Sequence, residues 1–548
     1  MQTLSLFKEQ GSKCKSIEFT AKENICFNDK KGHCNPDECP FAKHYYDKLL
    51  NTILDSLEFH DTFDRKTIEK ISYEKQMCPF QLQLDISEYC DCLVMDYSYV
   101  FDYHDRLDLE EGSVAGTHTA LCIDECHNLP ERVRDMYSIE IERKTFQDAL
   151  SLLGLSEFSA LKNDVLNALK AWDDTPVDLE CEDYLKEGVN ILKKLSEEFI
   201  DSIYDFILDM KSVLKKHALL ITDPLLEFFY QINSLYYLST LVNDEEKGSS
   251  FLCYDRVNSS KEIQSLRIAN LNSRDIIKEC TDSFESVIYF SATLSPKNYY
   301  IDLLSGKLTE DNHLFLPSPF PYEKRRVFFD TRLSLRYRDR DQTLYQVFSL
   351  CKAAIEVKKG NYFIFCPSFD YLERIESFFF QDPIENCEVI SQGRGMNEEK
   401  REEFLDKFKE DNEKTTIGLL VLGGVFSEGI DLVGERLIGA IIISAGLPQI
   451  SFERNHLKDF YDSESEEEKK GFAYAYTYPG INKILQAGGR VIRSEEDRGF
   501  LIYIDSRFRQ PIYQKVFQEI YPDAIRVISN SSVKQVLKQF WEEKENEI

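Results

Sequence analysis

Short apolar runs bounded by polar or turn-forming residues alternate with helix-length segments over much of this 548-residue chain. In the first part, runs at 90–95, 120–123 and 286–290 predict short buried strands. After residue 325 the alternation becomes regular. Strands are predicted there at 362–365, 417–422, 437–443 and 500–504, and helices at 371–380, 398–410 and 481–493. Alternating strands and helices with short connections indicate a doubly wound parallel sheet.

Residues 132–250 have a different pattern. Apolar positions recur there with a helical period, as at 185–219 and 224–242, and strand signals are few. We therefore predict an all-helical insertion. The first seven residues are typical of the middle of a helix.

Length and charge narrow the class of protein. A chain of 548 residues is expected to form three or four compact units. The net charge of −30 argues against nucleic-acid binding by the whole surface, although a local basic groove remains compatible with it. No apolar run reaches 18 residues and no signal-peptide core opens the chain, so we predict a cytoplasmic protein. In that reducing compartment, 15 cysteines indicate buried thiols or metal ligands rather than disulfides.

Two adjacent carboxylates, Asp124 and Glu125, follow the predicted strand at 120–123, and Cys126 and His127 come next. Paired carboxylates at the end of a buried strand suit nucleotide hydrolysis. The first can hold Mg²⁺, and the second can activate a water molecule toward the γ-phosphate. An acidic loop after a strand is the alternative interpretation of these residues alone.

Three further segments follow in order, each beside a predicted strand or helix. They are Ser-Ala-Thr-Leu-Ser-Pro at 291–296, a glycine-rich stretch at 423–431, and Gln-Ala-Gly-Gly-Arg-Val-Ile-Arg at 486–493. Agreement in both order and context argues against chance.

These segments resemble motifs II, III, V and VI of superfamily-two helicases. Residues 318–321 (Ser-Pro-Phe-Pro), 361–368 and 497–508 are similar to segments of its XPD/DinG branch, here of bacterial type. The resemblance covers essentially the whole chain and is weakest in the helical insertion. It implies an α/β fold with two RecA-like parallel-sheet motor domains, an iron–sulfur insertion and an all-helical arch insertion.

The resemblance also implies a division of the chain. The expected parts are a remnant of motor domain 1 (1–20), an iron–sulfur cluster domain (21–82), motor domain 1 (83–131), a helical arch domain (132–250), the continuation of motor domain 1 (251–324) and motor domain 2 (325–548).

The family's catalytic roles fall on matching residues of both motor domains. The expected catalytic residues are Asp124, Glu125, His127, Gln486, Arg490 and Arg493, and the expected nucleotide-binding residues are Asp124, Gly429 and Asp431. Arg490 and Arg493 are expected on one face of the helix at 481–493, as arginine fingers facing ATP across the cleft between the two sheets. Salt bridges to Glu495 or Glu496 are the alternative. We assign no catalytic role to Ser291 and Thr293. In the family, this segment relays the nucleotide state to DNA, and the alternative is that a loop hydroxyl caps a neighbouring helix.

Four cysteines, Cys26, Cys34, Cys39 and Cys78, share one window. Such clusters hold zinc or iron–sulfur centres, and four structural cysteines are the alternative. No Cys-x-x-Cys pair is present, which disfavours a zinc ribbon, and the spacing is not that of a bacterial ferredoxin. The segments Cys-Pro-Phe at 78–80 and Asp-Tyr-Ser-Tyr at 96–99 resemble the end of the branch's iron–sulfur domain, which implies a [4Fe–4S] cluster on these four thiols. Cys90 and Cys92, in a predicted buried strand, are better explained as core thiols.

Contacts to DNA are predicted from position. Ser368 and Tyr371 follow the strand at 362–365, and Tyr97 and Tyr99 could stack on bases. Core aromatics are the alternative for both tyrosines.

A P-loop, Gly-x-x-x-x-Gly-Lys-Ser/Thr, does not occur in the sequence. The one Gly-Lys pair, at 306–307, precedes Leu308 and has Ile301 where the first glycine should stand. By resemblance, the N-terminal helix should follow a P-loop unit of ~30 residues or more. We therefore expect a fragment, whose partner is a separate upstream segment carrying the P-loop, or a natural product without ATPase activity. The retained Asp124, Glu125, Arg490 and Arg493 favour the fragment.

The resemblance implies an ATP-dependent DNA helicase that unwinds duplexes by 5′-3′ tracking on single-stranded DNA in repair or replication. ATP, Mg²⁺, the cluster, and single-stranded and forked DNA are the expected ligands, with no membrane association. A non-enzymatic remnant that binds single-stranded DNA or a partner is the alternative. An iron–sulfur redox protein would have no need of the segments at 124–127 and 486–493.

Overall fold

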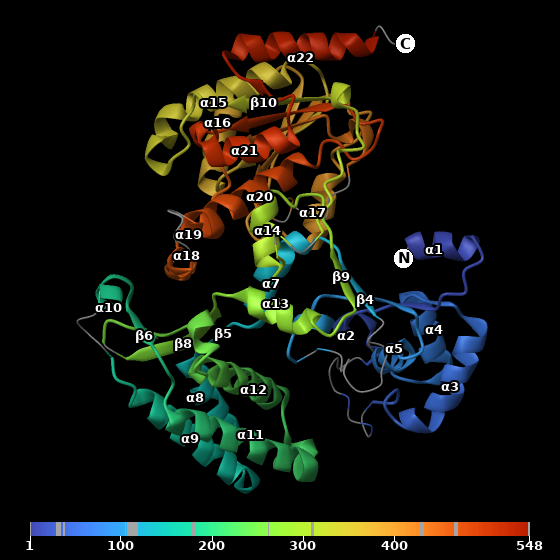
Figure 1. The fold of residues 1–548 in the computed structure, drawn as a ribbon, viewed down its shortest axis with the longest axis vertical. Helices are drawn as coiled ribbons and strands as arrows, with labels where there is room; N and C mark the ends of the chain where they lie inside the picture. Colours follow the sequence, from blue (N-terminus) through green and yellow to red (C-terminus); the bar gives the residue numbers. More distant parts are fainter. Residues whose placement is uncertain are drawn as a thin grey trace. The chain divides into compact units, whose positions relative to one another are not determined.

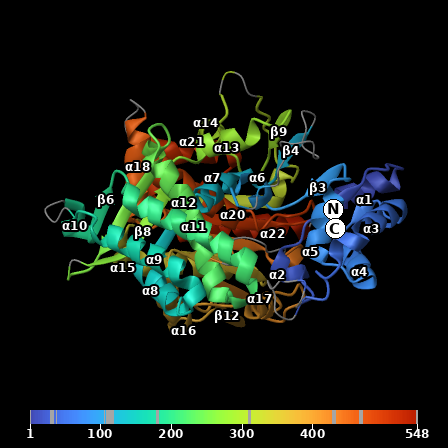
Figure 2. The ribbon, with the colours of Figure 1, turned by 90° about the horizontal axis from the view of Figure 1, so that it is seen from below.

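The structure is a computed structural model (Figures 1 and 2). The contacts within the chain divide it into two compact units. Unit 1 comprises residues 1–292 and 302–305, and unit 2 comprises 293–301 and 306–548. The residues described are 2–28, 34, 36, 39–104, 106, 119–177, 182–260, 262–307, 309, 312–424, 426, 432–464 and 470–545.

Unit 1 begins with a small parallel sheet covered by helices. Its strands, in the order β2-β1-β3, are β2 (Thr62–Phe63), β1 (Ser16–Glu18) and β3 (Cys92–Val94). The helices of this region are α1 (Gln2–Glu9), α2 (Lys22–Ile25), α3 (Tyr45–Phe59), α4 (Arg65–Lys75), α5 (Pro79–Ser87) and α6 (Ser98–Phe101). Ile17, Phe63, Ile68 and Leu82 form one buried cluster that joins the sheet to α4 and α5. The predicted strand at 90–95 and the N-terminal helix are both present.

A second parallel sheet of unit 1 carries the carboxylate segment. It pairs β4 (Ala120–Ile123) with β9 (Ser286–Tyr289), as the apolar runs predict. Both strands remain largely uncovered: Ile288 is 53% exposed and Phe290, directly after β9, is 44% exposed. Parallel strands are normally buried on both faces, so this sheet has an unusual amount of apolar surface in contact with solvent.

The rest of unit 1 corrects one prediction. The region at 132–250 is mainly helical, but it is not all-helical. Its helices are α7 (Leu129–Met136), α8 (Arg143–Leu152), α9 (Ser159–Asp173), α10 (Glu182–Glu187), α11 (Glu197–His217) and α12 (Asp223–Asn243), and α13 (Ser273–Thr281) follows later. Its strands β5 (Ile139–Glu142) and β6 (Val189–Leu192) join β7 (Phe251–Val257) and β8 (Ile263–Asn270) in an antiparallel sheet of order β5-β8-β7-β6.

The helical pattern at 185–219 is interrupted at Gly188. Its φ of 65° is a left-handed conformation that ends α10, and a Cβ there would lie 3.0 Å from the carbonyl oxygen of Val257. The Gly188 carbonyl accepts a hydrogen bond from the Val257 N–H at 2.8 Å, which starts the β6–β7 pairing. A pairing with a strand more than sixty residues away leaves no trace in the helical period.

Unit 2 is built on a seven-stranded parallel sheet of order β12-β13-β11-β14-β15-β10-β16. The strands are β10 (Arg325–Asp330), β11 (Asn361–Cys366), β12 (Cys387–Ser391), β13 (Thr415–Val421), β14 (Gly439–Ile443), β15 (Gly499–Ile504) and β16 (Ile525–Arg526). The helices are α15 (Arg340–Ile355), α16 (Phe369–Gln381), α17 (Glu398–Leu405), α18 (Phe452–Ser463), α19 (Lys470–Phe472), α20 (Tyr478–Gly488), α21 (Pro511–Ile520) and α22 (Asn530–Glu545), with α14 (Lys297–Leu303) before them.

Alternate side chains of the central strands of unit 2 enter two different cores. Tyr362 and Ile364 of β11 lie in the core that includes residues of α15, α16 and α22. Phe363 and Phe365 lie in the core that includes residues of α20 and α21. Helices therefore cover both faces of the sheet, and the predicted α/β class with a doubly wound parallel sheet is confirmed.

Candidate active site

The two carboxylates follow β4 directly. Because β4 and β9 are parallel and in register from Ala120↔Ser286 to Ile123↔Tyr289, their carboxyl ends lie at the same edge. Asp124 and Glu125 are both exposed at this edge. In open parallel sheets, ligands bind beyond the carboxyl ends of the strands, so the position suits a site.

Glu125 has a left-handed backbone with φ of 46°, which is uncommon for a residue with a side chain. Hydrogen bonds from three backbone N–H groups hold this turn. The Glu125 N–H donates to Asp124 Oδ1 at 2.7 Å, the Asn128 N–H donates to the Glu125 carbonyl at 2.9 Å, and the Cys126 N–H donates to the Phe290 carbonyl at 3.2 Å. The turn thus separates the two adjacent carboxylates from β4 by a change of backbone conformation at Glu125.

Ser291 joins the carboxylate segment to the segment after β9. Its hydroxyl donates to Glu125 Oε2 at 2.9 Å and lies 2.7 Å from Nδ1 of His127. The same Nδ1 lies 3.3 Å from Glu125 Oε2, and the His127 side chain is only 3% exposed. Since the single hydroxyl proton goes to Glu125, Nδ1 of His127 carries the hydrogen in its bond to Ser291. Two motifs 166 residues apart thus meet at one carboxylate.

Sequence reasoning gave Ser291 no role at the carboxylates. The signal that could have found it was its place directly after a strand predicted to be parallel to the strand before Asp124. Parallel neighbours end at one edge, so residues following the two strands come close together.

Tyr97, predicted as a base-stacking residue, is half-buried and its hydroxyl donates to the Asp124 carbonyl oxygen. Burial is the main cause that raises the pKa of its hydroxyl, so the group stays a protonated donor at neutral pH. Tyr99 packs its ring against Phe19, with centroids 4.9 Å apart. In this structure Tyr97 therefore supports the carboxylate segment, and its contact with DNA stays a prediction.

In unit 2, Gln486 lies on α20 but Arg490 and Arg493 do not. The helix ends at Gly488, so the predicted helical face that would carry both arginines does not exist. The cause is the glycine pair at 488–489, which favours a helix end. Gly488 is also required by packing, because a Cβ there would lie 2.1 Å from the Tyr503 hydroxyl oxygen.

The segment that carries the arginines is held by Asp497. This carboxylate is 1% exposed and accepts hydrogen bonds from the N–H groups of Arg493 at 2.6 Å, Ser494 at 2.7 Å and Gly434 at 2.8 Å. Arg493 is exposed on this anchored segment, and Arg490 is partly buried. A fixed loop replaces the predicted helix as the element that positions them.

The remainder of the Ser-Ala-Thr segment belongs to unit 2. The Thr293 hydroxyl donates to Asn482 Oδ1 of α20 at 3.2 Å, and the Ser295 hydroxyl donates to Glu519 Oε2 of α21 at 2.8 Å. The first bond attaches the segment to α20, the helix that carries Gln486, and the second attaches it to α21. Gly429 and Asp431, predicted to bind the nucleotide, lie outside the described residues.

The four predicted cluster ligands lie in the first region of unit 1. Cys26 and Cys78 are half-buried, Cys34 is exposed and Cys39 is buried. Burial raises the pKa of the Cys78 thiol, and the neighbouring Cys34 and Cys26 add to the rise. Within the described parts of the chain, no group of three potential ligands is arranged to hold a metal. The donor chemistry fits a cluster, whereas the arrangement in this structure does not.

The two predicted DNA contacts of unit 2 have structural roles. Ser368 is the N-cap of α16, where its hydroxyl accepts from the Tyr371 N–H at 3.3 Å. Tyr371 is 1% exposed, so its ring cannot contact DNA in this conformation. Ser368 is not fully buried and its contact with DNA stays a prediction.

Comparisons with known proteins agree with this architecture. The family model DEAD_2 matches residues 8–146, and a helicase C-terminal domain model matches residues 351–524. The first match contains the Asp124–Glu125 pair, and the second contains Gln486, Arg490 and Arg493. Two solved structures, an XPD helicase (TM-score 0.53, 15% identity) and Xpd4 of S. tokodaii (TM-score 0.52, 13% identity), each cover 95% of the chain and are covered to 92% and 96%.

Curated relatives are distant in sequence. The chain is 25% identical over 299 residues to a probable ATP-dependent helicase of Methanocaldococcus jannaschii, covering 52% of this chain and 42% of the relative. It is 21% identical to the ATP-dependent DNA helicase CHL1 of Candida albicans, over 95% of this chain and 70% of the relative. It is also 21% identical to the 3′-5′ exonuclease DinG of Staphylococcus aureus, over 75% of this chain and 49% of the relative. The chain thus spans from two fifths to about two thirds of the relatives' lengths.

The two helicase family matches fall in different parts of the chain, and the fold is similar to that of the XPD structures. Along most of its length the chain is similar to XPD/DinG-like proteins, and the curated relatives that it resembles include ATP-dependent DNA helicases. None of the described helices is both long enough and apolar enough to span a bilayer.

Proposed function

We propose that this protein is the motor of an ATP-dependent DNA helicase that tracks 5′-3′ along single-stranded DNA and opens forked duplexes in repair or replication. One observation carries the ATPase part of the proposal: Ser291 holds Glu125 and His127 together at the carboxyl edge of β4 and β9. A structural acidic loop would have no need of a hydroxyl and an imidazole fixed on one of its carboxylates. The direction of tracking rests on the resemblance alone.

The roles follow from the chemistry of each group. The Asp124 carboxylate is proposed to hold Mg²⁺, and the exposed Glu125 carboxylate to orient a water molecule and accept its proton. Ser291 and His127 keep Glu125 in one orientation. Gln486, Arg490 and Arg493 are proposed to act on the phosphates of ATP, and Gly429 and Asp431 to bind the nucleotide.

A [4Fe–4S] cluster on Cys26, Cys34, Cys39 and Cys78 is part of the proposal. Its support is the set of four thiols and the proximity of Cys34 and Cys26 to Cys78 that the pKa of Cys78 reflects. Because the thiols are not arranged for a metal in this structure, no step of the mechanism depends on the cluster. Iron and sulfide analysis of anaerobically purified protein, beside a Cys78→Ser variant, tests it. Zinc without iron would contradict it.

We further propose that a strand–loop–helix segment carrying a P-loop completes the ATPase site. The sequence has no such loop, and Asp124 and Glu125 alone supply no backbone N–H groups or lysine to hold the phosphates. The exposed Ile288 of β9 and Phe290 directly after it support the proposal, because an added strand with its helix would cover them.

Single-stranded-DNA-stimulated ATP hydrolysis tests the function. We expect little hydrolysis by the chain alone and clear hydrolysis when it is fused to the P-loop unit of a helicase relative. In the fusion, Glu125→Gln should reduce the rate ~10²–10⁴-fold because the general base is lost. Glu197→Gln, the same change at an exposed position of α11, is the matched control.

Three other results would revise the proposal. Hydrolysis by the chain alone that Glu125→Gln abolishes would mean that another segment replaces the P-loop. An active fusion that Glu125→Gln leaves unchanged would remove the role proposed for Glu125. An inactive fusion that still binds single-stranded DNA would favour a non-enzymatic DNA-binding remnant.

A further inference from the structure

The loop that follows β10 is basic, whereas the chain as a whole is strongly acidic. Residues 331–340 (Thr-Arg-Leu-Ser-Leu-Arg-Tyr-Arg-Asp-Arg) contain four arginines and one aspartate, a net charge of +3 within a chain of net charge −30. We call residues 331–340 the arginine loop. Local charge controls contact with phosphates, so a basic loop on an acidic protein is a candidate for binding a polyanion.

The centre of the arginine loop is presented to solvent. Tyr337 is 89% exposed, and Arg336 and Arg338 on either side of it are exposed as well. Arg338 makes one weak ion pair, 3.6 Å to Asp339, while its side chain remains 76% exposed. Arg336 has no carboxylate partner among the residues that the structure describes. An exposed aromatic ring between two exposed guanidinium groups is well suited to a base and its flanking phosphates.

The ends of the arginine loop are fixed. The Arg332 guanidinium bonds both carboxylate oxygens of Asp330, at 3.0 and 2.7 Å, and also Asn530 Oδ1 at 3.1 Å and the Ile528 carbonyl at 3.0 Å. At the other end, Arg340 Nε donates to the Leu335 carbonyl at 3.2 Å. Because these two arginines hold the loop, Arg336 and Arg338 remain for a ligand.

The arginine loop lies at the carboxyl edge of the seven-stranded sheet. It follows β10, Ser368 follows β11, and the parallel strands all end at this edge. A second basic segment reaches the loop from the end of β15, since Arg509 Nε donates to the Thr331 hydroxyl at 3.1 Å. Ligands of open parallel sheets bind at this edge, so the charge is placed where the fold favours binding.

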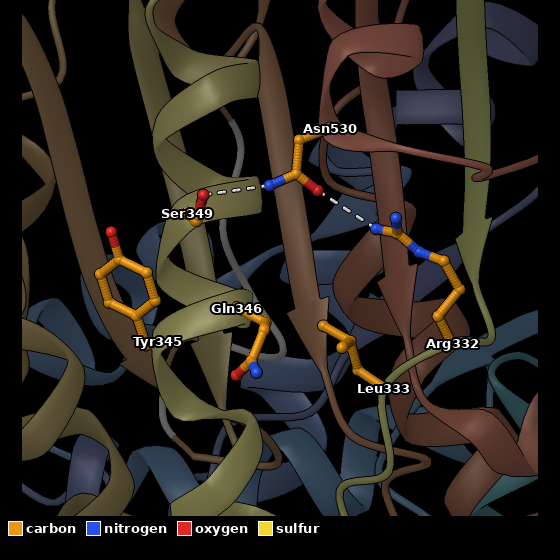
Figure 3. A pocket seen from close by; sticks show the side chains of 6 residues that line it. All are labelled: Arg332, Leu333, Tyr345, Gln346, Ser349 and Asn530. Atoms are coloured by element: carbon orange, nitrogen blue, oxygen red, sulfur yellow. Dashed lines mark hydrogen bonds between the residues drawn. The ribbon is translucent and has the colours of Figure 1, made fainter.

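A cavity of about 200 Å³ adjoins the arginine loop (Figure 3). It is lined by Arg332, Leu333, Tyr345, Gln346, Ser349 and Asn530. Asn530 Nδ2 donates to the Ser349 hydroxyl at 3.1 Å, and the Tyr345 ring is 60% exposed beside it. The cavity thus offers an aromatic surface with amide and hydroxyl groups, which suits a base more than a phosphate.

We propose that the arginine loop is a contact site for single-stranded DNA, with Arg336 and Arg338 on phosphates, Tyr337 stacked on a base and the adjoining cavity receiving a neighbouring base. The choice of ligand rests on the proposed function, whereas the site itself is additional to every residue named there. An acidic peptide would use the arginines but not the aromatic surfaces, so single-stranded DNA is the ligand that the observations favour.

Binding of a fluorescent oligo-dT to the full chain, measured by anisotropy without ATP over a range of salt concentrations, tests the site. We expect Arg336→Glu/Arg338→Glu to weaken binding about tenfold or more and to lower the slope of log affinity against log salt by about 1.4, at ~0.7 per phosphate contact. The matched control is Lys359→Glu/Lys409→Glu, which makes the same charge change at two exposed lysines around the opposite, amino end of β11.

Tyr337 separates stacking from charge. Tyr337→Ala should weaken oligo-dT binding about tenfold with an unchanged salt slope, and Tyr337→Phe should restore binding, because stacking needs the ring and not the hydroxyl. All these positions are exposed, and circular dichroism should be unchanged in every variant.

The outcomes distinguish this site from the proposed ATPase. Loss of oligo-dT binding in the Arg336/Arg338 variant but not in the lysine control supports the site, even if no ATP hydrolysis is found in any form of the protein. Wild-type affinity in the Arg336/Arg338 and Tyr337→Ala variants overturns it, even if the fusion is an active ATPase. Failure of the wild-type chain to bind oligo-dT, or equal weakening of poly-glutamate binding by Tyr337→Ala, also overturns it.

Discussion

The β4–β9 sheet of unit 1 and the β10–β16 sheet of unit 2 are both parallel, and short apolar runs predict strands in both. Their strands differ in how far they are buried. Every residue of β11, β14 and β15 is buried. In β4 and β9, Ile123 is the one buried residue. An apolar run therefore specifies a parallel strand, but its burial depends on neighbours that come from elsewhere in the sequence.

The chemistry is divided in the opposite way. The uncovered sheet carries Asp124, Glu125 and Ser291, the best-connected candidate groups. The fully covered sheet carries arginines on loops, at 331–340 and 490–493. The comparison shows that the burial of a sheet does not determine how well the candidate groups at its edge are connected. Three measurements test this difference between the two sheets.

The largest expected effect is on stability. Ile441→Ala in β14, where the side chain is fully buried, should lower the free energy of unfolding by about 2–5 kcal/mol through lost burial and a cavity. Ile288→Ala in β9 should change it by no more than about 0.5 kcal/mol, because that side chain is half in water already. Hydrogen exchange of peptides from β14 and β9 in urea reports each unit by itself. Similar losses in both would break the comparison and imply that β9 is covered in solution.

A second measurement tests whether the weak burial of unit 1 is confined to β4 and β9. Asp255 of β7 is fully buried, with Trp172 Nε1 donating to Oδ1 at 2.9 Å. Burial raises its pKa from 3.8 to about 6. The folded state then binds this proton more tightly than the unfolded chain does, so stability is lost as pH rises from about 4 to about 6, by roughly 3 kcal/mol at most.

Asp255→Asn should remove this pH dependence while keeping a group of the same shape. The measurement is the unfolding free energy of wild type and variant at pH 4.5 and 7. If the difference in unfolding free energy between wild type and variant does not grow with pH, Asp255 is solvated. Poor burial would then extend to the antiparallel sheet.

The smallest effect concerns Ser368 at the start of α16. Ser368→Ala removes the N-cap and should cost about 1 kcal/mol in unit 2, whereas Ser368→Asp should retain the cap. If Ser368 also contacts DNA, the Asp variant should bind oligo-dT more weakly than the Ala variant, because it adds a negative charge. Equal affinities in the two variants would leave Ser368 with its capping role alone.

Local patterns predicted most of the fold. The strands at 120–123, 286–290 and 362–365, and the parallel sheet of unit 2, follow from short apolar runs and alternation, which are local properties. The failures involve distant partners. β6 exists because it pairs with β7, and residue 488, where α20 ends, must be a glycine because the Tyr503 hydroxyl leaves no room for a Cβ.

The candidate site was predicted in its residue types and less well in its connections. Asp124 and Glu125 could be found because adjacent carboxylates after a strand are a local signal. The role of Ser291 could be predicted only from the pairing of β4 with β9. The anchoring of Arg493 depends on Asp497, which lies four residues further along the chain and is buried. Tyr371 failed as a surface residue because its position on α16 directs the ring into the core.

The arginine loop has a consequence for the speed of binding. The net charge of −30 repels an approaching strand of DNA at long range, whereas the local charge of residues 331–340 attracts it at short range. Added salt shortens the range of the field to about 10 Å at 0.1 M, which weakens the long-range repulsion more than the contact itself. Moderate salt should therefore speed encounter while it shortens the lifetime of the complex, so that the protein exchanges strands fastest under conditions where it holds them least tightly.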